Sequence, residues 1–370
     1  MSLRRVPLWL LTTAFRFLPW PCRPGLRVVG KPGPASPVLL TSNFALTVDT
    51  VTRALGEIDA WLLVANSRGI NVWCAAAGGH LNTHAVIAAL KTTGVADRVD
   101  HRRLVLPQLA ATGVQTDLLR ARTGWESVWG PVYVEDLPDF LLGKEKAEMR
   151  EVRFDLCQRL EMALMWATPL SALALVTLLF WPDGLLPLLA LIWGLTLAVY
   201  GAFPLYEGLV RRGSLVGTVA LFGGLAVAGV ATAGVLTGHR LLSFVLRWGG
   251  LALTVVLLLA FDLAGSTPLF KSWSHEERGY GVELDEEVCT RCGRCAQVCP
   301  RGVFTVAEAV SLAGASSCVQ CGACIVQCPA DALAFVTPSG VRVPPENTRR
   351  YKLNLMGRRS GLSDGVESIC

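Results

Sequence analysis

A block of 105 residues, Met162–Ser266, constrains the fold most strongly because it carries only seven formal charges. The apolar runs in this block cover residues 162–182, 184–206, 213–238 and 241–261, the last of which is broken only by Arg247. About 20 apolar residues in a helix are enough to cross the ~30 Å hydrocarbon core of a membrane. The runs predict four transmembrane helices, and a set of buried helices in a soluble protein is the alternative.

Basic residues alternate between the ends of these runs. Five precede the first run, none lies in the connection at 181–184, and the later ones are Arg211, Arg212, Arg240, Arg247, Lys271 and Arg278. Because Lys and Arg favour the cytoplasmic side, the pattern predicts a multi-pass protein of the cytoplasmic (inner) membrane. With four spans, the soluble domains before and after the block both face the cytoplasm.

Composition agrees with this organisation. Of the 370 residues 52% are hydrophobic and 17% are charged, whereas a soluble domain has about 25% charged residues. The net charge of +5 is small and spread out, so we expect no nucleic-acid partner. The predicted domains are an N-terminal segment (1–24), an α/β domain (25–158), a transmembrane domain (160–266), a ferredoxin domain (280–337) and a basic tail (338–370).

The N-terminal segment has two interpretations. Arg4 and Arg5 precede an apolar stretch, as in a secretory signal peptide, but Arg16 interrupts the stretch and no small-residue cleavage motif follows. An amphipathic segment on the membrane surface is favoured.

Eight of the twelve cysteines form two matched runs, Cys289–Pro300 and Cys318–Pro329. Both runs read C-x2-C-x2-C-x3-C-P and repeat after 29 residues, which is the spacing of bacterial ferredoxins with two [4Fe-4S] clusters. In that pattern the fourth cysteine of each run ligates the other cluster. The predicted ligand sets are Cys289, Cys292, Cys295 and Cys328 for one cluster, and Cys318, Cys321, Cys324 and Cys299 for the other. A zinc site is the alternative, although zinc usually takes two C-x2-C pairs.

The region 25–158 alternates apolar strands with helical stretches. The predicted strands are 38–40, 60–64, 70–73 and 104–106, and the predicted helices are 83–91 and 136–142. This order favours an α/β domain with a mainly parallel sheet, in which ligands bind at the carboxyl ends of the strands.

One predicted strand end, Gly69–His80, carries an unusual run of small residues after Cys74. We expect the strand to end at Asn71–Cys74 and a helix to begin at Ala75–Gly79, so that a bulky flat cofactor can approach the backbone. Cys74 would then lie at a helix N-terminus, which favours its thiolate form. A buried structural cysteine is the alternative.

Several stretches of the chain resemble the corrinoid protein family of mercury methylation, whose corrinoid-binding domain is related to the large subunit of the corrinoid iron–sulfur protein of acetyl-CoA synthesis. The family motif Asn-Val/Ile-Trp-Cys-Ala is similar to Asn71–Ala75. Further similar stretches are 36–44, 58–64, 101–109, 130–132 and the end of the membrane block, 261–268. The C-terminal part resembles the ferredoxin partner of that family, so the chain looks like both proteins fused.

The resemblance implies a Rossmann-like corrinoid-binding domain, four transmembrane helices and a 2[4Fe-4S] ferredoxin domain. It implies cobalamin as a cofactor, with Cys74 as the lower axial ligand of cobalt. The other implied contacts are Thr41, Asn43, Asn71, Val72, Trp73, Ala75, Ala76, Gly78, Gly79, Pro107 and Gln108. No Asp-x-His-x-x-Gly motif, the usual signature of histidine ligation, occurs in the chain.

The implied activity is a membrane-bound corrinoid-dependent methyltransferase that transfers a methyl group from methylcobalamin to Hg(II). The two clusters would return cobalt to Co(I), and Cys370 in the tail would deliver Hg(II). The implied partners are a methyl-donor protein or methyltetrahydrofolate system and a low-potential electron donor.

Two other functions stay open. The family has Gly-Lys after the position of Ala76, but this chain has Ala77-Gly78, and the tail ends in one cysteine rather than a pair. The methyl acceptor is then another metal or metalloid, a thiol or a one-carbon carrier. Alternatively, the protein is an electron-transfer subunit of the membrane without a corrinoid.

The remaining candidates have weaker signals. His80 and His84 are spaced to share a helix face and form a metal pair, or they are solvated. Cys157 is expected to pack beside the first span, and Cys22 has no assigned role. The basic residues from Arg349 onward are expected to form a solvated tail near the anionic leaflet.

Overall fold

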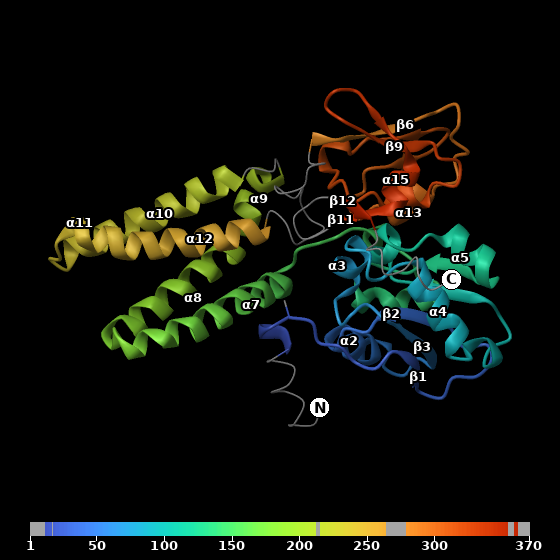
Figure 1. Ribbon diagram of the computed structural model, residues 1–370, viewed down its shortest axis with the longest axis horizontal. Coiled ribbons are helices and arrows are strands. Elements are labelled where there is room, and N and C mark those ends of the chain that lie inside the picture. The colour runs from blue at the N-terminus through green and yellow to red at the C-terminus, as the bar shows by residue number, and fades with distance from the viewer. Residues whose placement is uncertain (1–11, 17, 212–214, 264–278, 354–358, 362–370) are drawn as a thin grey trace. The chain divides into compact units, whose positions relative to one another are not determined.

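The computed structural model describes residues 12–16, 18–211, 215–263, 279–353 and 359–361 (Figure 1). The chain divides into two compact units. One unit combines Met1–Leu18 with Arg153–Trp273, and the other combines Pro19–Val152 with Ser274–Cys370. The α/β part and the cysteine-rich part therefore belong to the same unit, although the whole apolar block separates them in the sequence.

The α/β part is built on a five-stranded sheet in the order β1-β3-β2-β4-β5. Its strands are β1 (Gly25–Val29), β2 (Val38–Ser42), β3 (Ala60–Ala65), β4 (Arg103–Leu106) and β5 (Glu126–Trp129). Strands β3, β2, β4 and β5 are parallel, and β1 runs antiparallel at the edge. The prediction of a mainly parallel sheet is confirmed, while β1 and β5 were not predicted.

Alternating side chains divide the core between the two faces of this sheet. Val38, Leu40 and Leu63 face a cluster that includes residues of α4 (Thr83–Thr92), η2 (Gln108–Thr112) and α5 (Thr116–Thr123). Leu39 and Leu62 face a second cluster with α2 (Ala45–Leu55) and α6 (Leu137–Leu141). The sheet is thus covered on both faces, as parallel sheets require.

The predicted strand at 70–73 is wrong, because the structure has α3 (Val72–Ala77) there. The β-branched and aromatic residues Ile70, Val72 and Trp73 favour a strand by propensity. Asn71 instead caps a helix by accepting a hydrogen bond from the backbone N–H of Cys74. The capping hydrogen bond therefore favours a helix here, although the neighbouring residues have a high strand propensity.

The cysteine-rich part combines a small antiparallel sheet with two short helices. The sheet has the order β10-β9-β6, with β6 (Gly281–Leu284), β9 (Leu333–Val336) and β10 (Arg342–Val343). The helices are α13 (Arg294–Val298) and α14 (Ala323–Gln327). Short pairs of strands complete it: β7 (Thr305–Val306) with β8 (Val310–Ser311), and β11 (Tyr351–Leu353) with β12 (Arg359–Gly361).

The fold of this part continues past residue 337. Strand β10 pairs with β9, and α15 (Pro345–Arg350) follows it. The guanidinium of Arg349 donates to the backbone oxygens of Ile325 and Cys328 and forms an ion pair with Asp331. The expectation of a solvated tail is therefore wrong for Arg349, because this residue fastens α15 to the cysteine-rich loops.

The other unit consists mainly of long apolar helices. They are α7 (Leu156–Ala174), α8 (Leu185–Gly201), α9 (Phe203–Arg211), α10 (Leu215–Leu236), α11 (Leu241–Phe244) and α12 (Gly250–Leu263), with a π-helical turn (Val245–Gly249) before α12. Four segments of the described chain are long and apolar enough to cross a membrane: Leu156–Leu179, Pro182–Gly201, Val216–Leu236 and Leu241–Leu263. They coincide closely with the four runs predicted from the sequence.

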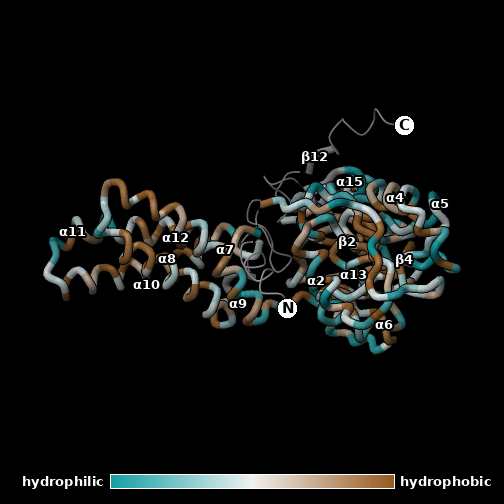
Figure 2. The backbone as a smooth tube through the Cα atoms, turned by 90° about the horizontal axis from the view of Figure 1, so that it is seen from below, coloured by the Kyte–Doolittle hydropathy of each residue, from teal (hydrophilic) through white to brown (hydrophobic). Residues whose placement is uncertain are grey.

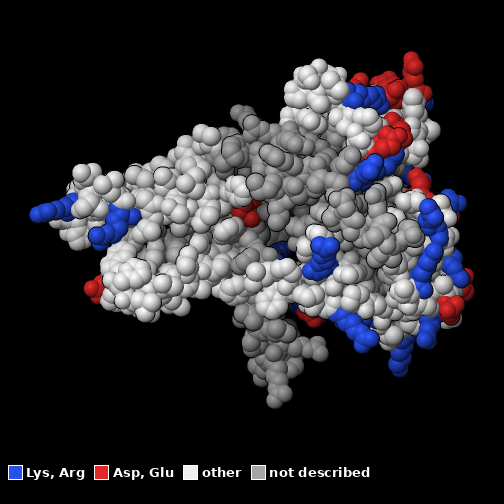
Figure 3. Space-filling view, viewed as in Figure 1, with Lys and Arg blue, Asp and Glu red and all other residues white. Residues whose placement is uncertain are grey.

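The surface of these helices is unusually apolar for contact with water. Leu179, Leu205 and Leu236 are each more than 80% exposed. Hydrophobic residues follow the helices along most of their length (Figure 2), and on the face shown in Figure 3 the charged side chains gather towards the ends of the helices. Large exposed apolar surfaces mark membrane or protein contacts.

Asp262 of this unit is buried, whereas Cys157 is exposed. Asp262 is 8% exposed and accepts a hydrogen bond from the hydroxyl of Tyr200 at 3.0 Å, which joins α8 to α12. Cys157 is exposed at the beginning of α7, so the expectation that it packs against neighbouring residues is wrong.

Candidate functional site

The centre of the candidate site is α3, which presents one thiol to solvent. Cys74 is exposed, while Ala75 and Ala76 are fully buried beneath it. The side-chain amide of Asn71 donates a hydrogen bond to Cys74 Sγ at 3.5 Å, and its oxygen accepts one from the Cys74 N–H at 2.9 Å. The alternative of a buried structural cysteine is therefore wrong. The amide of Asn71 therefore holds the sulfur in place at the exposed face of α3.

The helix lies where ligands of open parallel sheets usually bind. The chain leaves β2 for β3 on one side and later returns to β4 on the other, so the order of strands changes between β2 and β4. Helix α3 follows β3, η2 follows β4, and the two pack against each other. Ligands bind outside the carboxyl ends of strands at such a switch point.

Small residues allow the close approach of α3 to the segment after η2. A Cβ atom added to Gly113 would lie 2.3 Å from the oxygen of Leu81 and 2.9 Å from that of Ala76. No real side chain tolerates these distances, so only glycine fits at position 113 while the backbone stays in place.

The predicted cofactor contacts fall into two groups. Cys74 is exposed and Asn71, Val72, Trp73, Gly78 and Pro107 are half-buried, so these residues can meet a ligand. Ala75, Ala76, Gly79, Thr41, Asn43 and Gln108 are buried. The buried residues lie within the protein and are not available to a ligand at the surface of α3.

Asn43 and Gln108 show what this support consists of. The Asn43 side-chain oxygen accepts hydrogen bonds from the N–H groups of Ser67 and Gly69, which shapes the loop before α3. Its amide nitrogen donates to the backbone oxygen of Cys22. The amide of Gln108 donates to the backbone oxygen of Arg150 at 2.7 Å. Both side chains therefore form hydrogen bonds with backbone groups of the protein rather than with solvent.

Thr41 and Ser42 end β2 and are both buried. The alternation along the strand places Thr41 on the face of α2 and Ser42 on the face of α3. Neither hydroxyl has a hydrogen-bond partner within the part of the chain that the structure describes. Ser42 was not predicted as a site residue, because nothing in its local sequence distinguishes it from an ordinary strand end.

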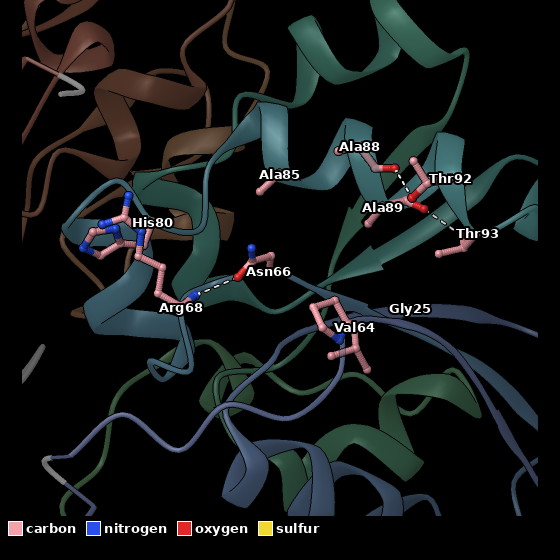
Figure 4. Close-up of a pocket in the computed structure, with 11 residues that line it drawn as sticks. Gly25, Val64, Asn66, Arg68, His80, Ala85, Ala88, Ala89, Thr92 and Thr93 are labelled. Carbon is pink, nitrogen blue, oxygen red and sulfur yellow. Dashed lines mark hydrogen bonds between the residues drawn. The ribbon is translucent and has the colours of Figure 1, made fainter. Parts of the chain in front are cut away.

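A pocket of about 460 Å³ opens beside α4 (Figure 4). Its volume falls in the range typical of ligand pockets, about 300–1,000 Å³. Small residues of α4 form one wall, and Arg68 and His80 lie at one end. The lining residues are Pro24, Gly25, Val64, Asn66, Arg68, His80, Ala85, Ala88, Ala89, Thr92 and Thr93. This pocket was not predicted from the sequence, because its walls come from separate segments of the chain.

His80 lines this pocket and does not share a helix with His84. It lies before Asn82, which caps α4, whereas His84 lies inside α4. Burial and the positive charge of Arg68 lower the pKa of His80 from its usual value. The hypothesis of a histidine metal pair on one helix is therefore wrong.

The two cysteine runs fold into loops of the same shape. Arg291 and Gln320 both adopt positive φ, of 57° and 51°, and Gly293 and Gly322 follow at 73° and 75°. Each glycine caps the short helix that carries the third cysteine, Cys295 in α13 and Cys324 in α14. The 29-residue repeat in the sequence is thus a repeat of backbone geometry.

The side chains of the cysteines gather in two groups. Cys289, Cys292, Cys295 and Cys328 line one small cavity. Burial raises the pKa of Cys295 to about 11, and burial together with Cys321, Cys318 and Cys299 raises that of Cys324. Bare thiolates are disfavoured in such surroundings, whereas a positively charged metal group stabilises them. The residues of the cavity are those of the first predicted set, while Cys295 also acts electrostatically on Cys324, so the division into two ligand sets stays a prediction.

Residues 16–141 match the family described as CO dehydrogenase/acetyl-CoA synthase delta subunit, and residues 281–329 match a 4Fe-4S dicluster domain. Similar curated proteins are gamma subunits of acetyl-CoA decarbonylase/synthase complexes. The protein of Archaeoglobus fulgidus is 41% identical over 111 residues, which are 30% of this chain and 23% of that protein. The protein of Methanopyrus kandleri is 41% identical over 125 residues, 33% of this chain and 27% of that protein.

The chain thus matches about a quarter of the length of these relatives. Its α/β part is related to a domain of acetyl-CoA decarbonylase/synthase proteins, and its cysteine-rich part is a 4Fe-4S dicluster domain. Cys370, Lys271 and Arg278 lie outside the described residues.

Proposed function

We propose that the protein is a membrane-bound corrinoid-dependent methyltransferase with its own iron–sulfur reductase. The observation that carries the proposal is the exposed thiol of Cys74, held on α3 over the switch point of the sheet. Similarity to acetyl-CoA decarbonylase/synthase subunits covers this same part of the chain.

The residues around α3 fit a corrinoid by size and chemistry. When bound, a corrinoid supplies a cobalt ion that carries the methyl group. Cys74 would supply a thiolate ligand to the cobalt, since transition metals bind thiolates. Asn71 orients the sulfur. The pocket with Arg68 would hold the phosphate-containing tail of the corrinoid, because a guanidinium binds phosphate well.

We assign the two groups of cysteines to two [4Fe-4S] clusters. The outer site consists of Cys289, Cys292, Cys295 and Cys328, and the inner site consists of Cys318, Cys321, Cys324 and Cys299. Iron–sulfur clusters cover potentials from about −700 to +450 mV, so reduction of a corrinoid is within their range.

The four apolar helices would anchor this machinery in the cytoplasmic membrane. Pro19–Val152 and Ser274–Cys370 belong to one compact unit. The four candidate spans lie between them in the chain. An even number of crossings leaves both parts on the same side, which the distribution of basic residues predicts to be the cytoplasm.

Hg(II) is the methyl acceptor in this proposal, since it is soft and binds thiolates strongly. Cys370 would deliver it. The specific observation that favours another acceptor is Ala77-Gly78 in place of the Gly-Lys of the mercury-methylating family. Methylmercury formed by the purified protein from a methyl donor and Hg(II) supports the first acceptor, and transfer only to a thiol or metalloid supports the second.

The test of corrinoid binding is an anaerobic visible and EPR spectrum of the cobalamin-reconstituted protein. We expect the cobalt signal to change in Cys74→Ala and to stay unchanged in Cys157→Ala, whose thiol is also exposed. A wild-type protein that retains no cobalamin would contradict the proposal and favour an electron-transfer subunit. An identical spectrum for both variants would show that Cys74 is not a ligand of cobalt.

A further inference from the structure

The cysteine-rich part shares a buried core with the α/β part. Val298 of α13 and Ala323 of α14 are 1% and 2% exposed. Both belong to the hydrophobic cluster that contains Ala75 and Ala76 of α3. The two parts are therefore packed together as the interior of one domain is packed.

Gln327 fixes the position of α14 against the segment after η2. It is 2% exposed, and its amide nitrogen donates to the backbone oxygens of Ala111 at 2.8 Å and Val114 at 2.6 Å. Its oxygen accepts from the hydroxyl of Thr116 at 3.0 Å. Few other side chains offer two donors and an acceptor in this arrangement, so the contact selects glutamine.

The segment that Gln327 binds also touches α3. Gly113 lies between Ala111 and Val114, and it packs against the backbone of Ala76. A short chain of packed groups thus leads from α14 through the segment after η2 to the helix of Cys74.

The two cluster sites differ in their exposure, although their loops have the same shape. Cys292 and Cys321 are equivalent in the 29-residue repeat. Cys292 of the outer site is exposed, whereas Cys321 of the inner site is half-buried and packs against the α/β core. The fourth ligands follow the same rule, since Cys299 of the inner site is buried and Cys328 of the outer site is half-buried.

We propose that electrons enter through the outer site and leave towards α3 through the inner site, and that Gln327 is the positioning residue for this transfer. A low-potential one-electron carrier loses one electron to the outer cluster. The electron then passes to the inner cluster and to the acceptor above α3, and no bond forms or breaks. The inference rests on the proposed function for the identity of that acceptor, but not for the order of the sites.

The test measures distances in the full-length, cluster-loaded protein without a corrinoid. Cys22, Cys157 and Cys370 are changed to Ser, and a nitroxide spin label is attached to Cys74. Pulsed EPR then reports how strongly each reduced cluster accelerates the relaxation of the label. We expect most of the acceleration to be lost in Cys321→Ser and retained in Cys292→Ser. The reverse result, or an equal loss in both variants, would overturn the order.

A second measurement keeps the order testable if one variant does not assemble its cluster. A water-soluble paramagnetic nickel complex added to the protein with native cluster ligands should broaden one cluster signal more than the other. We expect the outer cluster to give the more strongly broadened signal. Its signal is identified as the one that changes in Cys292→Ser, or as the one that stays unchanged in Cys321→Ser. Greater accessibility of the inner cluster would overturn the proposal.

The role of Gln327 is tested separately. Loss of its buried hydrogen bonds in Gln327→Ala should raise amide exchange over residues 108–116 by about ten- to a hundredfold. The acceleration of the Cys74 label should fall, while the iron content stays the same. Gln297→Ala is the control, because Gln297 lies in the equivalent helix α13 but its side chain is exposed. Unchanged exchange and relaxation in Gln327→Ala would overturn the positioning role. Because these readouts need no corrinoid, failure of corrinoid binding is a distinct result.

Discussion

The cysteine-rich loops and α3 both present thiols, but the two regions hold them in opposite ways. Cys295 and Cys324 are buried, in loops whose backbone repeats after 29 residues. Cys74 is a single exposed thiol, and its surroundings come from the segments that follow β2, β3 and β4. In the loops local spacing defines the site, whereas at α3 the tertiary fold defines it.

The largest effect should come from removing a buried ligand in the loops. We expect Cys324→Ser to lose the inner cluster and to unfold at a clearly lower temperature, because metal binding contributes to the folding of such sites. Anaerobic iron analysis and thermal melting measure both effects. Cys157→Ser is the control, and a similar loss of iron in that variant would contradict the assignment.

Overpacking beneath α3 should have the next largest effect. Gly113→Ala places a methyl group within 3 Å of two backbone oxygens, so one backbone segment must move. Overpacking of this kind costs about 1–3 kcal/mol. Chemical denaturation measures the loss, and Gly33→Ala is the control, because an added Cβ there would meet no neighbour within 4 Å and neither glycine has a positive φ.

Asn71 has two roles, capping α3 and donating a hydrogen bond to Cys74, and a smaller effect should distinguish them. Asn71 and Asn82 cap α3 and α4 in the same way. Replacing either by Ala should cost about 1 kcal/mol of stability. Only Asn71→Ala should also change the rate at which Cys74 reacts with a thiol reagent, because only Asn71 donates to its sulfur. Equal rates in both variants would show that this hydrogen bond is unimportant.

The smallest effect concerns the rim of the contact between the two parts. Arg294 and Asp117 form an ion pair at 2.7 Å, and their side chains are 33% and 55% exposed. Exposed pairs contribute about 0.2–1 kcal/mol. Arg294→Ala should therefore change amide exchange over 108–116 far less than Gln327→Ala does. A comparable change in amide exchange would show that the exposed rim stabilises the contact as much as its buried centre does.

These differences also explain what could be predicted from the sequence. The cysteine spacing predicts the loops, and the apolar runs predict the four long helices, because both signals are local. The strand predicted at 70–73 failed, since the cap formed by Asn71 outweighs the strand propensity of Val72 and Trp73. The role of Gln327 could not be predicted, because its partners lie more than 200 residues earlier in the chain. The pocket beside α4 was not predicted either, because separate segments between residues 24 and 93 form its walls.

The shared core of the two parts has a consequence for biosynthesis. Pro19–Val152 leaves the ribosome first, but Val298 and Ala323, which complete its hydrophobic cluster, follow only after the whole helical unit has been made. Until then the newly made domain lacks part of its apolar cover, and exposed surface of this kind favours aggregation. The cysteine-rich part must therefore be synthesised before the first domain of the chain can bury its whole core.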